Sequence, residues 1–476
     1  MNNRRAWRDF GAAMACALAL SPTFAHAAEF DGARLGLVWG LPFAGMLLSI
    51  ALFPLLAPHF WHRHFGKVAA LWALLFAIPF GAIYGSTEAV HQIAHAALLE
   101  YLPFVIMLFT LYTVAGGVCV LGNLHGSPGL NTGLLALGAA LTNVMGTTGA
   151  AMLMVRPLIR ANDNRKHNVH IFVFFIFLVA NAGGTLTPLG DPPLFLGFLK
   201  GVSFFWTVES MLPPTLLLCG VLLAIFYLLD RHYYKKGNEE WPSVMEVTPD
   251  TRVRLIGKVN LILIVAVVGV VLMSGLWRPG IKFTLLGSVL ELQDLLRDVM
   301  LVVIALVSLK ITPEAAHVGN GFNWAPIQEV AKLFAAIFVT IIPVIAILKV
   351  GEAGAFAPLV RLVTSPSGEP SNAMYFWLTG ILSAFLDNAP TYLVFFNLAG
   401  GDPVYLMAHR ETLEAISAGA VFMGALSYIG NAPNFMVKAI AEDRGIRMPS
   451  FFGYMAWSCV VLLPLFALLT LLFFND

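Results

Sequence analysis

One apolar segment of the chain is interrupted by residues that an undisturbed membrane helix does not contain. Residues 171–180 are apolar or aromatic, and residues 194–199 are apolar again. Between them, residues 181–193 carry three glycines, three prolines and one carboxylate, Asp191. Proline removes backbone donors and glycine weakens helical structure, so a helix cannot run through this stretch. Because irregular backbone at membrane depth is tolerated only beside protein or a water-filled cavity, we predict a discontinuous transmembrane helix that lines a site.

The interrupted pattern occurs a second time, close to the C-terminus. Residues 424–435 repeat residues 184–195, with two glycines, a leucine, a proline and a phenylalanine at matching positions. Asp191 of the first copy corresponds to Asn431 of the second. Paired interruptions in two halves of a membrane protein point to a binding site between those halves.

Composition places the chain in the membrane. Of its 476 residues, 58% are hydrophobic and 12% are charged, with a mean hydropathy of +0.80. A soluble domain carries about twice that charged fraction. We therefore predict an all-α polytopic membrane protein whose main partner is the lipid bilayer. The net charge of +1 and the lack of a basic tract in the sequence give no reason to expect a nucleic-acid partner.

The N-terminus has the three parts of a secretory signal. Three arginines precede an apolar stretch at 11–20, and small residues at 25–27 offer a cleavage position. We predict a signal peptide over 1–27, the alternative being an uncleaved first helix. Either form starts the mature chain outside the cytoplasm and places the protein in the inner (plasma) membrane.

Hydropathy and charge together predict two halves. Basic loops at 59–67, 160–166 and 230–258 are expected in the cytoplasm. A consistent count then requires that 129–159 enters and leaves by one face, as a re-entrant helical hairpin. The expected spans are 35–57, 68–85, 102–122, 212–229, 255–274, 299–309, 327–348 and 452–474, with a second hairpin at 373–397 and broken helices at 170–207 and 413–440. We predict inverted-topology repeats at 28–230 and 255–476, joined by a cytoplasmic linker at 231–254.

The four polar interruptions are expected to converge near the middle of the membrane. Hydroxyl, amide, carbonyl and carboxylate oxygens together suit a hard cation such as Na⁺. The candidate ion- or substrate-binding residues are Asn143, Thr147, Thr148, Gly184, Thr185, Thr187, Gly190, Asp191, Asp387, Asn388, Pro390, Thr391, Ser427, Gly430, Asn431 and Asn434.

Asp191 and Asp387 are the two candidates for direct contact with a transported Na⁺. A charged carboxylate at mid-membrane costs about 3 kcal/mol on insertion scales, which makes each a functional candidate. Since either a proton or a cation neutralises such a group, the two would compete for it. The structural alternatives are a helix N-cap for Asp191 and a tip-loop cap for Asp387. Matching the hairpin tips by sequence pairs Asp387 with Thr142.

The sequence contains no Walker loop, no dinucleotide-binding glycine pattern and no HExxH zinc motif. We therefore expect neither an enzyme nor a bound cofactor, and Na⁺ and H⁺ would act only as transported coupling ions.

Three stretches resemble the ion transporter superfamily, and most closely its NhaD-type sodium/proton antiporters, with arsenite permeases and citrate–metal transporters as relatives. They are residues 143–148 (NVMGTT), 183–191 (GGTLTPLGD) and 386–391 (LDNAPT). The resemblance implies inverted repeats, two re-entrant hairpins, two broken helices and a homodimer with an elevator-like motion. Residues 142–144 (TNV) and 387–389 (DNA) depart from the Ser-Asn-Thr tips of dicarboxylate members.

Two transport functions therefore remain open, and a membrane receptor or assembly factor that reuses this fold is the non-transport alternative. The first is antiport of Na⁺ or Li⁺ against protons, favoured because Asp387 would repel an anion and no Lys or Arg lies in the four interruptions. The second is transport of citrate, another organic anion or a metal–citrate complex.

Overall fold

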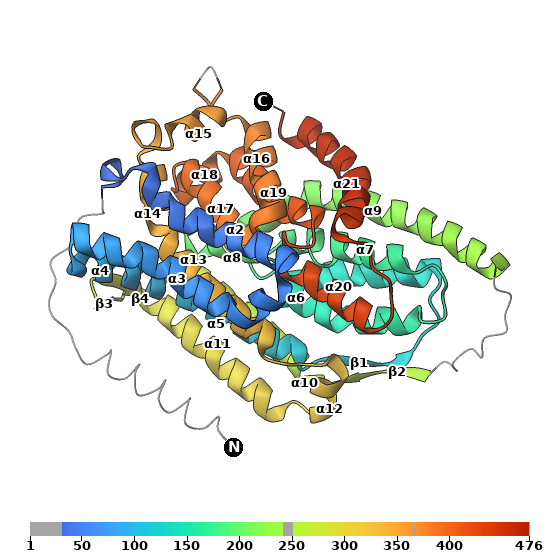
Figure 1. The fold of residues 1–476 in the computed structure, drawn as a ribbon. Coiled ribbons are helices and arrows are strands. Elements are labelled where there is room, and N and C mark those ends of the chain that lie inside the picture. Colours follow the sequence, from blue (N-terminus) through green and yellow to red (C-terminus); the bar gives the residue numbers. More distant parts are fainter. Residues whose placement is uncertain (1–30, 241–250, 366–367, 476) are drawn as a thin grey trace.

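The computed structural model describes residues 31–240, 251–365 and 368–475. The predicted signal peptide lies outside these residues, as does part of the predicted linker. Helices make up nearly all of the regular structure described, and only two small antiparallel sheets accompany them (Figure 1). Within the described residues, seven helices are long and apolar enough to cross a membrane, or eight if one bent pair counts as a span. The prediction of an all-α polytopic membrane protein is confirmed.

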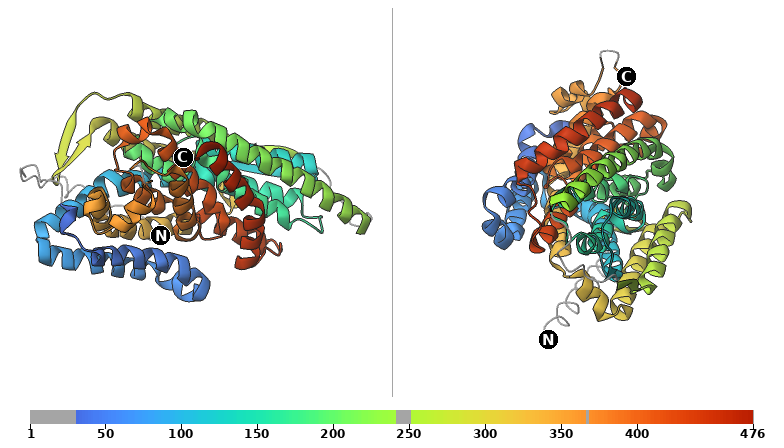
Figure 2. Two further views of the ribbon diagram at one scale, coloured as in Figure 1. Left: turned by 90° about the horizontal axis from the view of Figure 1, so that it is seen from above. Right: turned by 90° about the vertical axis from the view of Figure 1, so that its right-hand side faces the viewer.

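The N-terminal helices form a layer along one flank of the bundle (Figures 1 and 2). They are η1 (Gly32–Arg34), η2 (Leu37–Gly40), α2 (Leu41–Leu56), α3 (Pro58–Tyr84) and α4 (Ser86–Ala96). A π-helical turn η3 (Ala97–Tyr101) and helix α5 (Leu102–Gly116) follow, and α5 packs inside the bundle against α6 and α11. The basic segment 59–67, predicted to be a loop, is the first part of α3. Pro58 suits the start of a helix, and long basic side chains reach water from a helix end. The segment after Tyr84, also predicted to lie between spans, is largely helical.

Helix α6 (Pro128–Ala161) folds back on itself at Gly146, where φ is 74° and ψ is 158°. Its two ends lie side by side, because Asn131 and Asn162 exchange two amide hydrogen bonds of 2.9 Å. The segment is therefore a helical hairpin with Gly146 at its tip.

The open end of this hairpin is fixed by a buried carboxylate, Asp230 of α9 (Phe204–Glu240). Asp230 accepts from Asn131 at 2.9 Å and from two nitrogens of Arg165 at 2.5 and 3.1 Å. The Nε2 of His170 lies 2.8 Å from the same carboxylate. This cluster, here called the base cluster, ties both limbs of α6 to α9.

A second hairpin consists of α16 (Asn372–Leu386) and α17 (Asn388–Leu398). Its turn is Asp387, with φ 80° and ψ 139°, close to the conformation of Gly146. The two tips are therefore equivalent at Asp387 and Gly146, and the sequence match of Asp387 to Thr142 is wrong. The neighbouring equivalent pair is Asn388 and Thr147.

Both interruptions break their helices in the same way. The first runs from α7 (Val169–Leu178) through η4 (Ala182–Thr185) to α8 (Pro192–Leu199), and the second from α19 (Arg410–Phe422) through η6 (Met423–Leu426) to α20 (Ala432–Asp443). Asp191 and Asn431 occupy the N-cap positions with similar backbone angles, φ −145° and −152°.

Glycine at two of these positions is required by space. A Cβ on Gly190 would collide with the carbonyl oxygen of Gly184, and a Cβ on Gly430 would lie 2.6 Å from that of Gly424. The local structure of the break is thus repeated, whereas the inverted orientation of the two halves in the membrane stays a prediction.

The remaining elements pack around these four pieces. They are α10 (Val259–Leu276), α11 (Leu292–Ile311), α12 (Glu314–Asn320), α13 (Ala325–Thr340), α14 (Ile342–Lys349), η5 (Gly351–Ala353), α15 (Ala357–Leu362), α18 (Pro403–Ala408) and α21 (Phe451–Phe473). Helices α13 and α14 are bent by 41° at their junction.

Two short sheets were not predicted. Strand β1 (Cys119–Asn123) pairs with β2 (Thr251–Ile256) in antiparallel register, Val120 opposite Leu255. Strand β3 (Lys282–Leu285) pairs with β4 (Ser288–Glu291). Within the predicted linker 231–254, α9 continues to Glu240 and β2 starts at Thr251.

The span predicted at 299–309 is longer, since α11 begins at Leu292. Hydropathy misses its first turns because they are charged. Arg297 is buried there, 2.8 Å from Asp294 and 2.9 Å from Asp298, so its charge is compensated within the helix.

Elements of the two predicted halves contact each other at the centre of the bundle. Helix α8 packs against α17, and α20 packs against α6. Every residue of α7 is buried except the first, Val169. In α19, every residue from Thr412 to the end of the helix is buried. The four interruptions therefore lie where protein surrounds them, as irregular backbone in a membrane requires.

Candidate functional site

Asp191 is the centre of the site. Its side chain is 1% exposed and accepts three hydrogen bonds. Thr147 Oγ1 donates to Oδ1 at 2.9 Å, Asn431 Nδ2 donates to Oδ1 at 3.3 Å, and Asn388 Nδ2 donates to Oδ2 at 2.5 Å. The donors come from hairpin α6, the second break and hairpin α16–α17. All four interruptions thus meet at one carboxylate, and the predicted convergence of these residues is observed.

This carboxylate lacks a basic partner in the part of the chain that the structure describes: its hydrogen bonds come from a hydroxyl and two amides. Although Asp191 stands at the N-cap of α8, its side chain makes no capping hydrogen bond. The N-cap alternative therefore does not explain the residue. Burial of an unpaired carboxylate is costly, so it must be compensated by a proton or a bound cation.

Asn143 attaches the tip of hairpin α6 to the first break. Its Nδ2 donates to the Gly183 carbonyl at 2.7 Å, and its Oδ1 accepts from the Leu186 amide at 2.9 Å. Thr187 Oγ1 donates to the Asn143 carbonyl at 2.5 Å. The backbone amide of Thr147 donates to the Gly190 carbonyl at 2.9 Å. These contacts fix the position of Asp191 relative to Thr147.

Asn181 joins the two breaks and was missing from the predicted site residues. Its Nδ2 donates to Asn434 Oδ1 at 2.7 Å, and its Oδ1 accepts from Asn431 Nδ2 at 3.3 Å. Asn434 in turn donates to the carbonyls of Gly424 and Ser427, both at 2.9 Å. A sequence signal existed, because Asn181 is the first polar residue of the first interruption.

Asp387 occupies a different environment. Its carboxylate accepts from the Ala389 amide at 3.1 Å, so it does cap α17, and its carbonyl accepts from Thr391 Oγ1 at 2.7 Å. It lies within electrostatic reach of Asp191. Backbone angles of this kind are nearly exclusive to glycine and cost about 1–3 kcal/mol in other residues. The equivalent residue of the other tip is Gly146, so the strain arises only at Asp387, where the carboxylate caps α17.

Two side-chain hydroxyls that were predicted to bind an ion or substrate make hydrogen bonds within the protein instead. Thr185 Oγ1 donates to the Ala182 carbonyl at 3.0 Å and lies 2.6 Å from Thr215 Oγ1. Ser427 Oγ donates to the Ala384 carbonyl and accepts from the amide of Gly430 at 3.2 Å. Neither contacts Asp191, so these two stabilise the breaks. Pro390 is buried in the first turn of α17.

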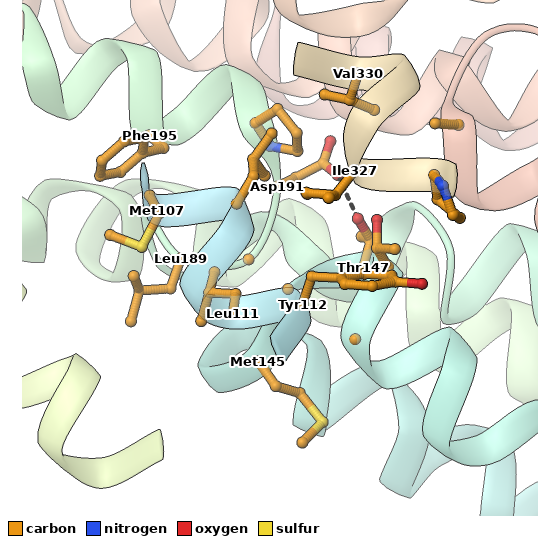
Figure 3. A pocket seen from close by; sticks show the side chains of 18 of the residues that line it. Met107, Leu111, Tyr112, Met145, Thr147, Leu189, Asp191, Phe195, Ile327 and Val330 are labelled. Atoms are coloured by element: carbon orange, nitrogen blue, oxygen red, sulfur yellow. Dashed lines mark hydrogen bonds between the residues drawn. The ribbon is translucent and has the colours of Figure 1, made fainter. Parts of the chain in front are cut away.

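A cavity of about 90 Å³ reaches Asp191 from the side of α5 and α13 (Figure 3). Thr147, Thr148 and Asp191 provide its polar side chains together with the Tyr112 ring, while most of its wall is apolar, including Met107, Leu111, Met145, Leu189, Phe195, Ile327, Val330 and Met436. Lys and Arg are not among its lining residues. No group of three or more acidic, histidine or cysteine side chains that could hold a metal occurs among the described residues. The site therefore offers one carboxylate with neutral oxygen donors.

Helical hairpins and broken helices that meet at a buried carboxylate within a polytopic bundle define a membrane transporter. The chain belongs to the family whose model is described as "putative citrate transport" (CitMHS_2), which matches residues 32–474. A search of curated proteins found no match. The family assignment covers nearly the whole of the described structure and points to a secondary transporter.

Proposed function

We propose that this protein exchanges a small cation, Na⁺ or Li⁺, for protons across the bacterial inner membrane. The observation that carries the proposal is Asp191, a buried carboxylate that neutral donors from the other three interruptions orient and that no basic side chain among the described residues neutralises. Such a group is stable when it holds either a proton or a cation. One site that binds the two alternately is sufficient for antiport.

The size and lining of the cavity support a small ion. An apolar cavity of about 150 Å³ holds a benzene molecule, and citrate has about twice as many heavy atoms as benzene. The cavity beside Asp191 has about 90 Å³ and is lined by no basic residue. A polyanion in this cavity would lie beside the carboxylate of Asp191. Asp387 is within electrostatic reach of Asp191 and would add to the repulsion. Like charges repel one another more strongly where water is scarce than in bulk water.

The oxygen atoms needed to coordinate a cation are close by. Asp191 supplies two, and the hydroxyl of Thr147 and the side-chain carbonyl of Asn388 can turn toward an ion when it displaces their hydrogen bonds. Hard cations prefer this donor set. The resemblance to NhaD-type antiporters favours the same kind of cation. We propose that Asp191 and Asp387 contact the transported Na⁺. A homodimer in the membrane, after removal of residues 1–27, is part of the same proposal.

The second candidate is transport of citrate or of a metal–citrate complex, and the family description favours it. A divalent ion bound to citrate would neutralise part of its charge and could contact Asp191 directly. This candidate requires the cavity to widen in another conformation of the transporter.

Transport measurements distinguish the two. In everted membrane vesicles that hold a respiration-driven pH gradient, Na⁺ or Li⁺ should dissipate the gradient, whereas K⁺ serves as the comparison ion. Uptake of labelled citrate, with and without Mg²⁺, is measured in vesicles containing the same protein. Cation-dependent dissipation without citrate uptake supports antiport. Citrate uptake with no response to any cation would sink the antiport proposal.

A further inference from the structure

A second cavity, of about 530 Å³, lies between the C-terminal end of α6 and the C-terminal end of α20, and Asp191 is not among its lining residues. Four of its lining residues are cations, Arg165, Lys166, Arg444 and Arg447, and one is an acid, Asp163. We call it the basic cavity. It is several times larger than the cavity beside Asp191, and it is independent of the transport site described above.

The positive side chains of the basic cavity differ in whether an acidic side chain neutralises them. Arg165 is neutralised by Asp230 at 2.5 Å. On α20 the neighbouring acid Glu442 is already paired with Lys438 at 2.7 Å. Arg444 and Arg447 are exposed, and the ion pairs found among the described residues include neither of them.

Further positive charge surrounds Arg444. It is within electrostatic reach of Arg156 and Arg160 on the second limb of α6. Arg160 donates to the carbonyls of Val120 at 2.6 Å and Gly122 at 3.3 Å, and these neutral acceptors leave its charge uncompensated. One guanidinium nitrogen of Arg156, Nη1, is buried and has no hydrogen-bond partner. Like charges are thus held together by the fold, which is costly unless a negative group binds among them.

We propose that the basic cavity binds an oxyanion, a phosphate or carboxylate group held chiefly by Arg444 and Arg447. Planar guanidinium groups match the geometry of such anions and bind them with two hydrogen bonds. The bound anion would bridge the open end of hairpin α6, which the base cluster fixes, to the C-terminal end of α20, whose opposite end begins at Asn431 of the transport site. It would therefore stabilise one arrangement of these two elements.

The oxyanion has two possible sources. By the charge rule this face of the protein is cytoplasmic, and basic pockets between membrane helices on that side bind the head groups of anionic phospholipids. A soluble anion such as inorganic phosphate or citrate presents the same chemistry. The experiment below separates the two.

The test uses the full-length protein, purified and delipidated in a neutral detergent. The midpoint of thermal unfolding is followed during titration with inorganic phosphate and, separately, with citrate, against chloride at the same ionic strength and the same cation concentration. Lipid binding is followed by native mass spectrometry with phosphatidylglycerol or cardiolipin, against phosphatidylcholine. The variants are Arg444→Gln/Arg447→Gln and, as a matched control, Arg231→Gln/Lys235→Gln, which removes two exposed cations of α9 that do not line the basic cavity.

In the wild type and the control, we expect saturable stabilisation by phosphate or selective retention of an anionic lipid. The Arg444→Gln/Arg447→Gln protein should bind at least about tenfold more weakly. A response confined to the soluble anions identifies a free oxyanion, and a response confined to the lipid arm identifies a head group.

The proposal is overturned if no arm responds, or if the Arg444→Gln/Arg447→Gln protein responds like the wild type. An Asp191→Asn protein should keep the response, because the basic cavity does not contain Asp191. If instead Asp191→Asn abolishes the citrate response and the arginine variant keeps it, citrate binds at the transport site and the basic cavity is not its site.

Discussion

Asn388 donates its side-chain amide to the carboxylate of Asp191 at 2.5 Å, across 197 residues of sequence. The bond joins the tip of the second hairpin to the break of the first discontinuous helix. Thr147, the equivalent residue of the other tip, donates to the opposite oxygen of the same group. One carboxylate is thus held by corresponding residues of both hairpins.

Asp191→Asn should reduce cation-dependent dissipation of the pH gradient to background, because an amide neither binds a proton nor attracts a cation as a carboxylate does. Thr147→Val and Asn388→Ala should keep some activity with cation affinity lower by about 10- to 100-fold, as found when groups that orient a metal ligand are removed. The measurement is the rate of dissipation in everted vesicles against Na⁺ concentration. Asp402→Asn, an exposed N-cap of α18, is the matched control and should behave like wild type. Full exchange in Asp191→Asn would remove this residue from the mechanism.

The Asp387→Gly substitution keeps the backbone turn at the tip of the second hairpin and removes only the carboxylate. Glycine adopts the observed φ of 80° without strain, so the variant should be more stable by about 1–3 kcal/mol, less the lost hydrogen bond to Ala389. If the carboxylate contributes to ion binding, exchange is lost while the protein remains folded. Unfolding in detergent and vesicle exchange are measured on the same preparation. A variant that is destabilised and fully active would show that Asp387 serves only the turn.

Proton and cation should compete for Asp191. The apparent KM for Na⁺ is then expected to rise as the pH falls, by roughly tenfold per pH unit at most, with little change in the maximal rate. This is measured as exchange against Na⁺ concentration at several pH values, with the pH gradient held constant. A pH effect on the maximal rate alone would mean that the two ions bind at separate places.

Asn181 and Asn434 should be energetically coupled. Hydrogen bonds between membrane helices measured by double-mutant cycles are worth about 0.6 kcal/mol on average and up to about 1.7 kcal/mol. We expect a coupling in this range between Asn181→Ala and Asn434→Ala in detergent unfolding. Asn131→Ala combined with Asn434→Ala should be additive, because the hydrogen bonds of Asn131 are to Asn162 and Asp230. Additivity in both pairs would contradict the contact between the two breaks.

Asp230→Ala should destabilise the protein by about 3–5 kcal/mol, because it leaves Arg165 buried without its partner. Asp294→Ala is the comparison. Asp294 is 44% exposed, and Arg297 keeps Asp298 when it is removed, so the expected loss is below about 1 kcal/mol. Equal losses in the two variants would show that the base cluster contributes nothing specific.

The sequence was sufficient to predict the helical class, both interruptions and the meeting of their polar residues. These features depend on proline, glycine and polar side chains within apolar runs, which have direct local consequences for a helix. Helix ends were predicted less well. Hydropathy treats the charges of Arg297 and Asp298 as separate, although they neutralise each other inside α11.

The equivalence of Asp387 with Gly146 was missed for a different reason. Backbone conformation, not side-chain similarity, defines the tip, and the two residues have no chemistry in common. Asn181 was missed because its role arises only when two segments 253 residues apart come together. No local pattern encodes that contact.

The two ends of hairpin α6 are restrained by different forces. Its open end is held by the charges of Asp230 and Arg165, whereas its tip is held by neutral hydrogen bonds around Asp191. In such a hairpin the open end is held more firmly than the tip, so the tip can shift more easily. An ion or proton that replaces a hydrogen bond at Asp191 therefore acts on the less firmly held end of the hairpin, and the two helical limbs, residues 128–145 and 147–161, carry any displacement toward the base cluster.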